Sequence, residues 1–390
     1  MKTIILGGVA AGMSAASKIK RVDPRVDVVV YEKRGFLSYG ACGLPYYVGG
    51  FNDDFRRMIA RSEETFHSMG VETHLHTEAL SVDFPRREVT LRGEKGEVFK
   101  DRYDKLLIAT GAESVVPPFP GREKRGVHVL KSLEDGIFLR EVAFDPSIRN
   151  VVIVGGGAIG LECADAFLNL QKDVTLIEAA DRVLTPFDPE FSEEAAKEVT
   201  RHGVKLHLSE KVQQFTGGER VESVETDRGQ YPADLVILSV GVRPSTGFLT
   251  DPRLKKAKNG AIIVDREMKS SITDVYAAGD CAATWHSLAR QQTYLALGTV
   301  ANKTGRIAGE NLCGRHQRFL GVLGSAAIKV CDMEFGRTGL GEAEAGALRE
   351  PVASVVVDAY DHPAYYPNPT PIKVKVIYEK RTKKLLGAQL

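Results

Sequence analysis

The sequence predicts an α/β fold built from two βαβ domains, the second inserted into the first, and a smaller α+β domain after them. A pattern of strand, glycine-rich turn, helix and strand begins at Thr3 and returns at Asn150. From about Gly321 the pattern changes to short strand-like segments that are typical of an antiparallel sheet. At 390 residues the chain is also too long for one hydrophobic core, so several domains are expected.

The first unit has the layout of a Rossmann-like dinucleotide-binding motif with one departure. Strand Thr3–Leu6 leads into the turn, a helix that ends near Arg21, and strand Val26–Glu32. The turn has glycine at both outer positions but Val9 in the middle, so the turn alone is a weak signal.

Two carboxylates strengthen this signal and point to FAD. Glu32 ends the second strand, and Asp280 ends a later strand, where a carboxylate can bind the ribityl arm of a flavin. N-capping of the following helix is the alternative role of Asp280. The residues expected to contact FAD are Gly7, Gly8, Val9, Ala10, Ala11, Gly12, Glu32, Lys33, Thr110, Gly111, Gly279, Asp280 and Thr299.

The second unit matches the dinucleotide fingerprint in full. Strand Val151–Val154 precedes the turn, a helix follows to about Gln171, and strand Val174–Glu178 ends in a carboxylate that can bind a ribose 2′-hydroxyl. A glycine-rich turn without a ligand is the alternative. Glu178 would repel a 2′-phosphate and so favours NADH, although Arg182 nearby leaves NADPH open. The expected nucleotide contacts are Gly155, Gly157, Ile159, Gly160, Glu178 and Gly241.

The predicted domain boundaries follow from this repeat. They are 1–114 for the first part of the FAD domain, 115–244 for the NAD(P)H domain, 245–320 for the second part of the FAD domain and 321–390 for an interface domain. Strands of the interface domain are expected at Ala326–Val330, Ala353–Asp358 and Ile372–Tyr378. The chain stops in a strand-like segment, so we expect that a C-terminal portion is missing.

Composition and charge favour a cytoplasmic protein and give no sign of nucleic acid or a membrane as a partner. A formal net charge of +1 gives no electrostatic reason to expect nucleic acid or an anionic membrane as a partner. No apolar run approaches the roughly 18 residues of a membrane helix, and the start lacks the layout of a signal peptide. The five scattered cysteines predict neither a disulfide framework nor a metal site.

Cys42 is the candidate redox residue. It lies in the segment 38–45, SYGACGLP, and no second cysteine is near it in the sequence. The small neighbours would let the sulfur approach a flat ring, and Pro45 suits the first turn of a helix, whose positive end favours a thiolate. A buried structural cysteine is the alternative. Without a partner cysteine, a redox-active sulfur must pair with oxygen or with a small soluble thiol.

The segments 7–18 (GGVAAGMSAASK) and 38–46 (SYGACGLPY) resemble the coenzyme A-disulfide reductase branch of the single-cysteine FAD/NAD(P)H oxidoreductases. The resemblance covers nearly the whole chain, and the group also includes NADH oxidases, NADH peroxidases and persulfide reductases. It implies a homodimer that uses FAD and NADH or NADPH. Oxidases and peroxidases of this group typically carry a histidine in the first glycine turn, where this chain has Val9, Ala10 and Ala11.

Several substrate contacts are implied by the same resemblance. The coenzyme A-binding positions of the group correspond here to Ser14, Lys18, Arg21, Ser38 and Asn302. Lys18 and Arg21 lie three apart on one helix face, where easing the helix dipole is their alternative role. Ala41 stands where some members have asparagine. The group has a substrate-contacting lysine near Gly70 that has no clear match in this chain, and Arg61 is the candidate to replace it.

Tyr365 and Tyr366 resemble the paired tyrosines of coenzyme A-disulfide reductases, in which a tyrosine of the opposite subunit protonates the leaving thiolate. Packing at an interface is the alternative for this aromatic pair. A second tyrosine of the group, and a rhodanese domain found in some relatives, would fall beyond Leu390.

The expected reaction passes hydride from NAD(P)H through FAD to Cys42, held as a mixed disulfide with coenzyme A, with Ser38 hydrogen-bonding sulfur or substrate. The substrate would be coenzyme A disulfide or a related persulfide or polysulfide. Two alternatives remain. One is an NADH oxidase or peroxidase that cycles Cys42 through a sulfenic acid, and the other is an NADH-responsive flavoprotein sensor.

Overall fold

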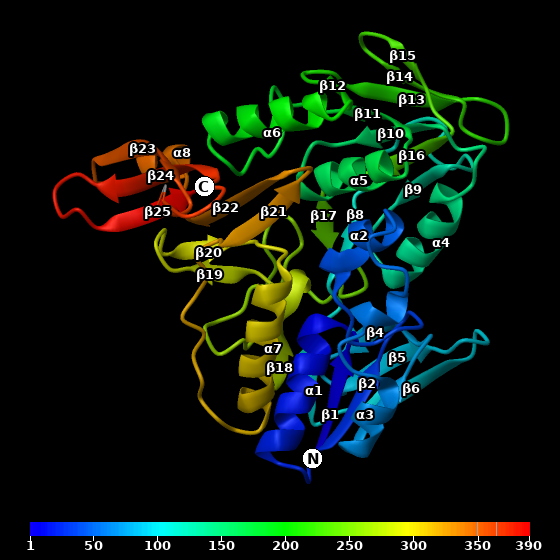
Figure 1. Cartoon of the computed structure of the whole chain (residues 1–390). Coiled ribbons are helices and arrows are strands. Elements are labelled where there is room, and N and C mark those ends of the chain that lie inside the picture. Colours follow the sequence, from blue (N-terminus) through cyan, green and yellow to red (C-terminus); the bar gives the residue numbers. More distant parts are fainter. Residues whose placement is uncertain (349, 364) are drawn as a thin grey trace.

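Two parallel sheets and one antiparallel sheet, each of five strands, organise the chain (Figure 1). The computed structural model describes residues 1–348, 350–363 and 365–390. The predicted α/β class, with two Rossmann-like sheets followed by an antiparallel sheet, is confirmed.

The first sheet has the strand order β18-β7-β1-β2-β3, with all neighbours parallel. Its strands are β1 (Lys2–Leu6), β2 (Asp27–Tyr31), β3 (Val71–His74), β7 (Lys105–Ile108) and β18 (Val275–Ala277). Helices α1 (Ala10–Val22) and α7 (Gly298–Leu312) pack side by side beside this sheet. Glycine permits this close packing, because a Cβ on Gly305 would lie 2.3 Å from the carbonyl oxygen of Ala11.

The second sheet has the order β12-β11-β10-β16-β9 and is also parallel. Its strands are β9 (Val127–Val129), β10 (Asn150–Val154), β11 (Asp173–Ile177), β12 (Lys205–His207) and β16 (Leu235–Leu238). Its helices are α4 (Leu133–Ala143), α5 (Ala158–Asn169) and α6 (Pro189–Arg201). Because these elements lie between β7 and β18 in the sequence, the second domain is inserted in the first. The chain leaves the first domain through β8 (Ala112–Ser114) and returns to it through β17 (Val242–Pro244), and these two strands pair antiparallel.

The third sheet has the order β21-β22-β25-β24-β23 and is antiparallel, as predicted. Its strands are β21 (Ala326–Val330), β22 (Met333–Gly339), β23 (Val352–Tyr360), β24 (Pro371–Glu379) and β25 (Leu385–Gln389), and helix α8 (Glu342–Gly346) follows β22. β23 and β24 are longer than expected, because each supplies the other with a pairing partner from Val352 opposite Glu379 to Tyr360 opposite Pro371.

Short elements complete the chain. They include helices α2 (Leu44–Val48) and α3 (Glu63–Ser68) and 3-10 turns at Ala41–Gly43, Phe55–Met58 and Gly279–Cys281. One small sheet contains β4 (Glu78–Asp83), β5 (Glu88–Arg92) and β6 (Val98–Arg102), and another contains β13 (Val212–Thr216), β14 (Ser223–Thr226) and β15 (Gln230–Pro232). Strands β19 (Thr284–His286) and β20 (Gln291–Thr293) form a two-stranded sheet.

One predicted helix end is wrong by two residues. The helix after the second glycine turn was expected to reach Gln171 but ends at Asn169. Gln171 has a φ of 58°, a left-handed backbone that cannot continue the helix. Among the residues that the structure describes, no helix combines the length and the apolar character needed to cross a membrane.

Candidate functional site

The first glycine turn forms a tight cradle at the carboxyl end of β1. A Cβ on Gly7 would lie 2.2 Å from the Ala109 carbonyl oxygen, and one on Gly12 would lie 1.9 Å from that of Gly7, so both positions require glycine. The amides of Gly8 and Arg34 donate to the two carboxylate oxygens of Glu32, at 2.7 and 2.9 Å. Burial raises the pKa of Glu32, and these two hydrogen bonds oppose the increase.

A cavity of about 560 Å³ adjoins this turn. Gly7, Glu32, Lys33 and Thr110 line it together, although they come from three separate segments of the chain. The Lys33 ammonium pairs with Glu113 at 2.9 Å. The structure thus gathers four residues predicted to contact FAD around one space. A backbone cradle and a lined cavity at the carboxyl edge of a parallel sheet suit a dinucleotide.

Asp280 lies in the 3-10 turn that follows β18. Its carboxylate is 3.4 Å from the ammonium of Lys131, and the amide of Gly279 donates to the hydroxyl of Thr304 at 3.1 Å. The alternative that Asp280 caps the following helix is wrong, because α7 begins at Gly298 and has Leu297 as its N-cap. Lys131 was missed in the sequence, since it lies 149 positions from its partner.

The second glycine turn repeats this plan at the carboxyl end of β10. The amides of Gly156 and Ala180 donate to the carboxylate of Glu178 at 2.6 and 2.7 Å. A Cβ on Gly160 would lie 1.9 Å from a carbonyl oxygen, whereas one on Gly157 would meet no atom within 4 Å. The fold therefore requires the outer glycine but not the middle one. A bare middle position leaves room for a closely approaching pyrophosphate.

The remaining predicted cofactor residues surround these two turns. Val9 is the N-cap of α1, Ala10 and Ala11 begin that helix, and Thr299 and Ile159 lie in the first turns of α7 and α5. Gly111 and Gly241, with φ of 67° and 105°, follow the carboxyl ends of β7 and β16. All of these positions are at the strand edges where ligands bind in open α/β sheets.

Cys42 is exposed in the 3-10 turn that precedes α2. The structure brings to its surroundings the charged side chains of Glu162 on α5, Lys131 before α4, and Asp280 after β18. The thiol therefore stands where the first and second parallel sheets meet. Glu162 was missed in the sequence, although it follows the outer glycine of the second turn by two positions.

The expected thiolate-favouring environment of Cys42 is corrected by the structure. The pKa of the thiol is raised, first by burial and next by the charge of Glu162, while Lys131 acts in the opposite direction. Because the residue as a whole is exposed, this burial is partial. Helix α2 has only five residues, so its dipole is too small to offset the carboxylates.

Glu162 is expected to control the reactivity of Cys42 with pH. Burial and the charge of Asp165 raise the pKa of Glu162 to about 7, so its carboxyl is neutral below that pH and charged above it. We expect Glu162→Gln to speed alkylation of Cys42 by iodoacetamide at pH 8 by roughly threefold, which corresponds to about half a pKa unit. The difference from the wild type should vanish below about pH 6, where the wild-type carboxyl is neutral too.

The alkylation rates should be followed by mass spectrometry from pH 5.5 to 9, with Glu334→Gln as the control. Burial raises the pKa of Tyr46 on helix α2, which follows Cys42, and the charge of Glu334 raises it further. Glu334 is therefore another carboxylate close to this part of the chain. Equal rates for wild type and Glu162→Gln over the whole pH range would contradict the assigned effect.

A second cavity, of about 270 Å³, lies beside α1 and reaches Gly40, two residues before Cys42. It brings together Ser14, Arg21, Ser38, Arg61 and Asn302, five of the six residues that the resemblance assigned to substrate binding. The guanidinium of Arg61 donates to the Ser17 hydroxyl at 3.0 Å, and the Ser14 hydroxyl donates to Asn302 at 2.7 Å. These contacts fix the side chains on both walls.

Two further facts about this cavity were not predicted. Arg306 on α7 is exposed and lines it as a third guanidinium, with no hydrogen-bond or ion-pair partner within the described part of the chain. Lys18, in contrast, is not among the lining residues, because its ammonium pairs with Glu310 at 2.7 Å. Both facts depend on the packing of α1 against α7. Ser14 and Asn302, which form a hydrogen bond between these helices, are 288 positions apart in the sequence.

Tyr365 and Tyr366 are not brought to Cys42 within one chain. Their rings are 4.9 Å apart, and their exposed fractions are 82% and 57%. They follow β23, the edge strand of the antiparallel sheet. Their predicted role remains a prediction about a second copy of the chain.

Comparisons with known proteins agree with this geometry. A family model described as pyridine nucleotide-disulphide oxidoreductase matches residues 1–305, and the dimerisation-domain model of the same description matches residues 325–390. The NAD(P)H coenzyme A polysulfide/persulfide reductase of Pyrococcus horikoshii is 38% identical over 390 residues, which are 100% of this chain and 87% of that protein.

Two solved structures are also similar to the whole chain. An NAD-dependent persulfide reductase from A. fulgidus has a TM-score of 0.95 at 33% identity and is covered over 73% of its length. A water-forming NADH oxidase from Lactobacillus brevis, bound to NADH, has a TM-score of 0.95 at 31% identity and is covered over 86%. Each covers 100% of this chain.

Proposed function

The chain belongs to the pyridine nucleotide-disulphide oxidoreductase family, and from this premise we propose that it reduces coenzyme A disulfide or a coenzyme A persulfide at Cys42. Enzymes of this family take electrons from NAD(P)H through FAD. NADH is the proposed donor, because Glu178 stands where a 2′-phosphate would be repelled.

The cavity beside α1 carries the proposal. Three guanidinium groups, those of Arg21, Arg61 and Arg306, line a space that begins two residues from Cys42. Coenzyme A has several phosphates at one end and a thiol at the other, and arginine is the side chain best suited to phosphate. Its nucleotide phosphates would meet the arginines while the pantetheine arm runs past Ser38 towards the sulfur.

The chain's own residues would then work as follows. The Cys42 thiolate attacks one sulfur of the disulfide, forms a mixed disulfide with coenzyme A and releases the other half as a thiolate. FAD, when bound, would supply the electron pair for breaking this mixed disulfide. The break restores the Cys42 thiolate and releases coenzyme A as a thiolate, which must take up a proton to become the thiol. Gly7, Glu32, Lys33, Thr110 and Asp280 would hold FAD, and the second glycine turn with Glu178 would hold the nicotinamide nucleotide.

A homodimer is part of the proposal, because residues 325–390 match a dimerisation domain. The edge strand β23 offers Val355, Val356 and Val357 as exposed apolar side chains, which a second copy could cover. The released thiolate would be protonated by Tyr365 or Tyr366 of the partner subunit. The reaction draws on NAD(P)H and coenzyme A, so we place it in the cytoplasm.

The state of Cys42 in the purified protein tests this function. Mass spectrometry of the intact, unreduced protein should show a reducible adduct of coenzyme A mass, and peptide mapping should place it on Cys42. Coenzyme A disulfide or a coenzyme A persulfide should accelerate NADH oxidation far above the rate with oxygen alone. No acceleration by any coenzyme A species would refute the proposal.

NADH oxidase activity is the second candidate. It is favoured by the exposure of Cys42 and by the likeness to the water-forming NADH oxidase. Against it, the first glycine turn carries Val9, Ala10 and Ala11 and offers no acid or base beside the thiol. A sulfenic acid on Cys42, with NADH oxidation that oxygen supports without a coenzyme A species, would select this candidate.

Gly157→Val is expected to weaken nucleotide binding and leave the fold unchanged. The position has ordinary extended backbone, with φ of −74° and ψ of −177°, and a Cβ added there would have no protein atom within 4 Å. A bound pyrophosphate would clash with it, so the KM for NADH should rise by at least about tenfold. Steady-state kinetics should show this rise, while the melting temperature and the flavin content stay at their wild-type values. A wild-type KM would contradict the proposed nucleotide site.

A further inference from the structure

The loop from Glu178 to Asp188 connects strand β11 to helix α6 and lies against the second glycine turn. At its near end, Glu178 binds the amides of Gly156 and Ala180, and the amide of Leu184 donates to the Gly156 carbonyl oxygen at 2.9 Å. The loop therefore lies directly on the turn proposed to hold the nicotinamide nucleotide. The position of the loop therefore determines the positions of the loop residues that would lie beside the nucleotide.

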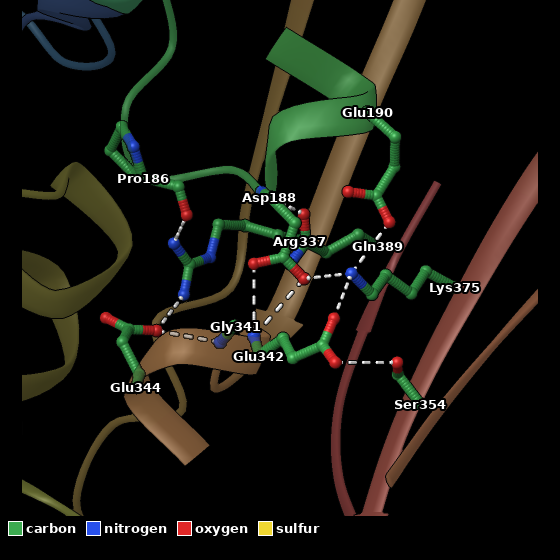
Figure 2. Close-up of polar contacts among 10 residues, drawn as sticks. All are labelled: Pro186, Asp188, Glu190, Arg337, Gly341, Glu342, Glu344, Ser354, Lys375 and Gln389. Carbon is green, nitrogen blue, oxygen red and sulfur yellow. Dashed lines mark hydrogen bonds and ion pairs between the residues drawn. The ribbon is translucent and has the colours of Figure 1, made fainter. Parts of the chain in front are cut away.

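The far end of this loop is held by the antiparallel sheet. Arg337 on β22 donates to the carbonyl oxygen of Pro186, and the ring of Phe187 meets that of Phe335 edge-on at 6.3 Å. The amide of Asp188 donates to the Gln389 side chain at 2.8 Å (Figure 2). Successive loop residues are thus bound by β22 and β25, which belong to the family's dimerisation domain.

Lys375 on β24 binds the same loop end through ion pairs (Figure 2). Its ammonium lies 2.9 Å from Asp188, 2.7 Å from Glu190 and 2.7 Å from Glu342, with only 3% of the side chain exposed. Burial alone would lower the pKa of Lys375, but the hydrogen bonds to these carboxylates raise it above its ordinary value. One buried cation thus joins three carboxylates from the loop end, α6 and α8.

Removal of this cation would leave the carboxylates facing one another. The Asp188 side chain is nearly buried and also accepts hydrogen bonds from the amide of Glu342, at 3.0 and 3.2 Å, so it cannot simply turn to solvent. Mutual repulsion would therefore move the loop end away from the sheet. The displacement would reach Arg182, whose buried Nε has no hydrogen-bond partner among the described residues. An unpaired buried donor beside the glycine turn is suited to a ligand.

We propose that Lys375 is a positioning residue for the nicotinamide nucleotide, because it fixes the loop between Glu178 and Asp188 from the dimerisation domain. The inference rests on the nucleotide site assigned under the proposed function. It assigns the dimerisation domain a part in nucleotide affinity in addition to pairing two copies. The coupling would be expressed in binding and not in the chemical step, since Lys375 touches none of the proposed reacting groups.

The test variant is Lys375→Met, which keeps the length of the side chain and removes its charge. Calorimetric titration of the purified holoenzyme with ADP-ribose measures binding without turnover. We expect the Kd for ADP-ribose and the KM for NADH to rise by at least about fivefold, the lower end of usual coupling between sites. The kcat, the KM for the disulfide and the dimer mass from light scattering should stay at wild-type values. Lys375→Arg should restore most of the affinity.

Lys373→Met is the matched control, because Lys373 lies on the same strand and pairs with Glu194 of the same helix at 3.0 Å, away from the loop. If Lys375→Met does not yield a folded dimer, Asp188→Asn tests the same link, since asparagine keeps an acceptor for the Glu342 amide but loses the charge. Its Kd should rise by about threefold.

The outcomes are distinct. Unchanged ADP-ribose binding in a folded Lys375→Met or Asp188→Asn dimer would overturn the positioning role, as would an equal loss in Lys373→Met. A wild-type protein that binds neither ADP-ribose nor NADH would refute the proposed nucleotide site itself, and the inference with it.

Discussion

Cys42→Ser should lower the rate of coenzyme A disulfide reduction by more than about a thousandfold, because a serine hydroxyl cannot form the mixed disulfide that the proposed cycle requires. The change removes one sulfur atom from an exposed side chain in a 3-10 turn, so neither the fold nor the two glycine turns should be disturbed. The variant should remain yellow from bound FAD. It should also still pass electrons from NADH to an artificial acceptor that takes them from the flavin directly.

Cys313→Ser is the control, since Cys313 is the other cysteine that is not buried and it contacts a carbonyl oxygen of α1. It should keep wild-type turnover with every acceptor. Comparison of the two acceptors in Cys42→Ser separates a lost thiol from a lost flavin. Full disulfide turnover in Cys42→Ser would show that the sulfur is not the site of reduction.

Features that depend on neighbours in the sequence could be predicted. The two glycine turns, their flanking strands and the carboxylates Glu32 and Glu178 were found because a βαβ unit places all of them within about thirty residues. The antiparallel third sheet followed from alternating strand-like segments. The residues at the middle position of the two turns, Val9 and Gly157, could also be identified from the local spacing of the glycines alone.

Features that depend on packing between distant segments could not be predicted. Glu310 on α7 meets Lys18 on α1, and Arg306 on α7 lines a cavity with residues of α1, because small residues let the two helices approach. The pairing of Lys18 and the place of Arg306 in the cavity were therefore invisible in the sequence. The pKa of Cys42 was expected to be lowered, but burial raises it, and so does the charge of Glu162, which comes from the inserted domain.

The same reason applies to the contacts of the inserted domain with the third sheet. Lys375 is one of two alternating lysines on β24, and nothing in its sequence neighbourhood distinguishes it from Lys373. Only the fold shows that Lys375 is buried among three carboxylates while Lys373 forms a single, more exposed pair. Charge alone, without burial and partners, does not identify a positioning residue.

Arg306→Gln should raise the KM for coenzyme A disulfide by about ten- to a hundredfold, the usual effect of losing one charge-assisted hydrogen bond to a phosphate. Arg306 is the cleanest of the three cavity arginines to test. Arg61 is bound to the hydroxyl of Ser17 and Arg21 to its carbonyl oxygen, so their removal would also disturb α1. The guanidinium of Arg306 makes no such contact with the described residues, and its loss should leave the melting temperature unchanged.

A small disulfide without phosphates, such as cystamine, separates recognition from chemistry. Its kcat/KM should be the same for wild type and Arg306→Gln, because it has nothing to bind in the arginine-lined cavity. Lys18→Met is the matched control on α1. The ion pair of Lys18 with Glu310 is partly buried and lies outside the cavity lining, so we expect at most about a twofold change in KM. A large effect of Lys18→Met with none of Arg306→Gln would place the coenzyme A phosphates at Lys18 and overturn the assignment of this cavity.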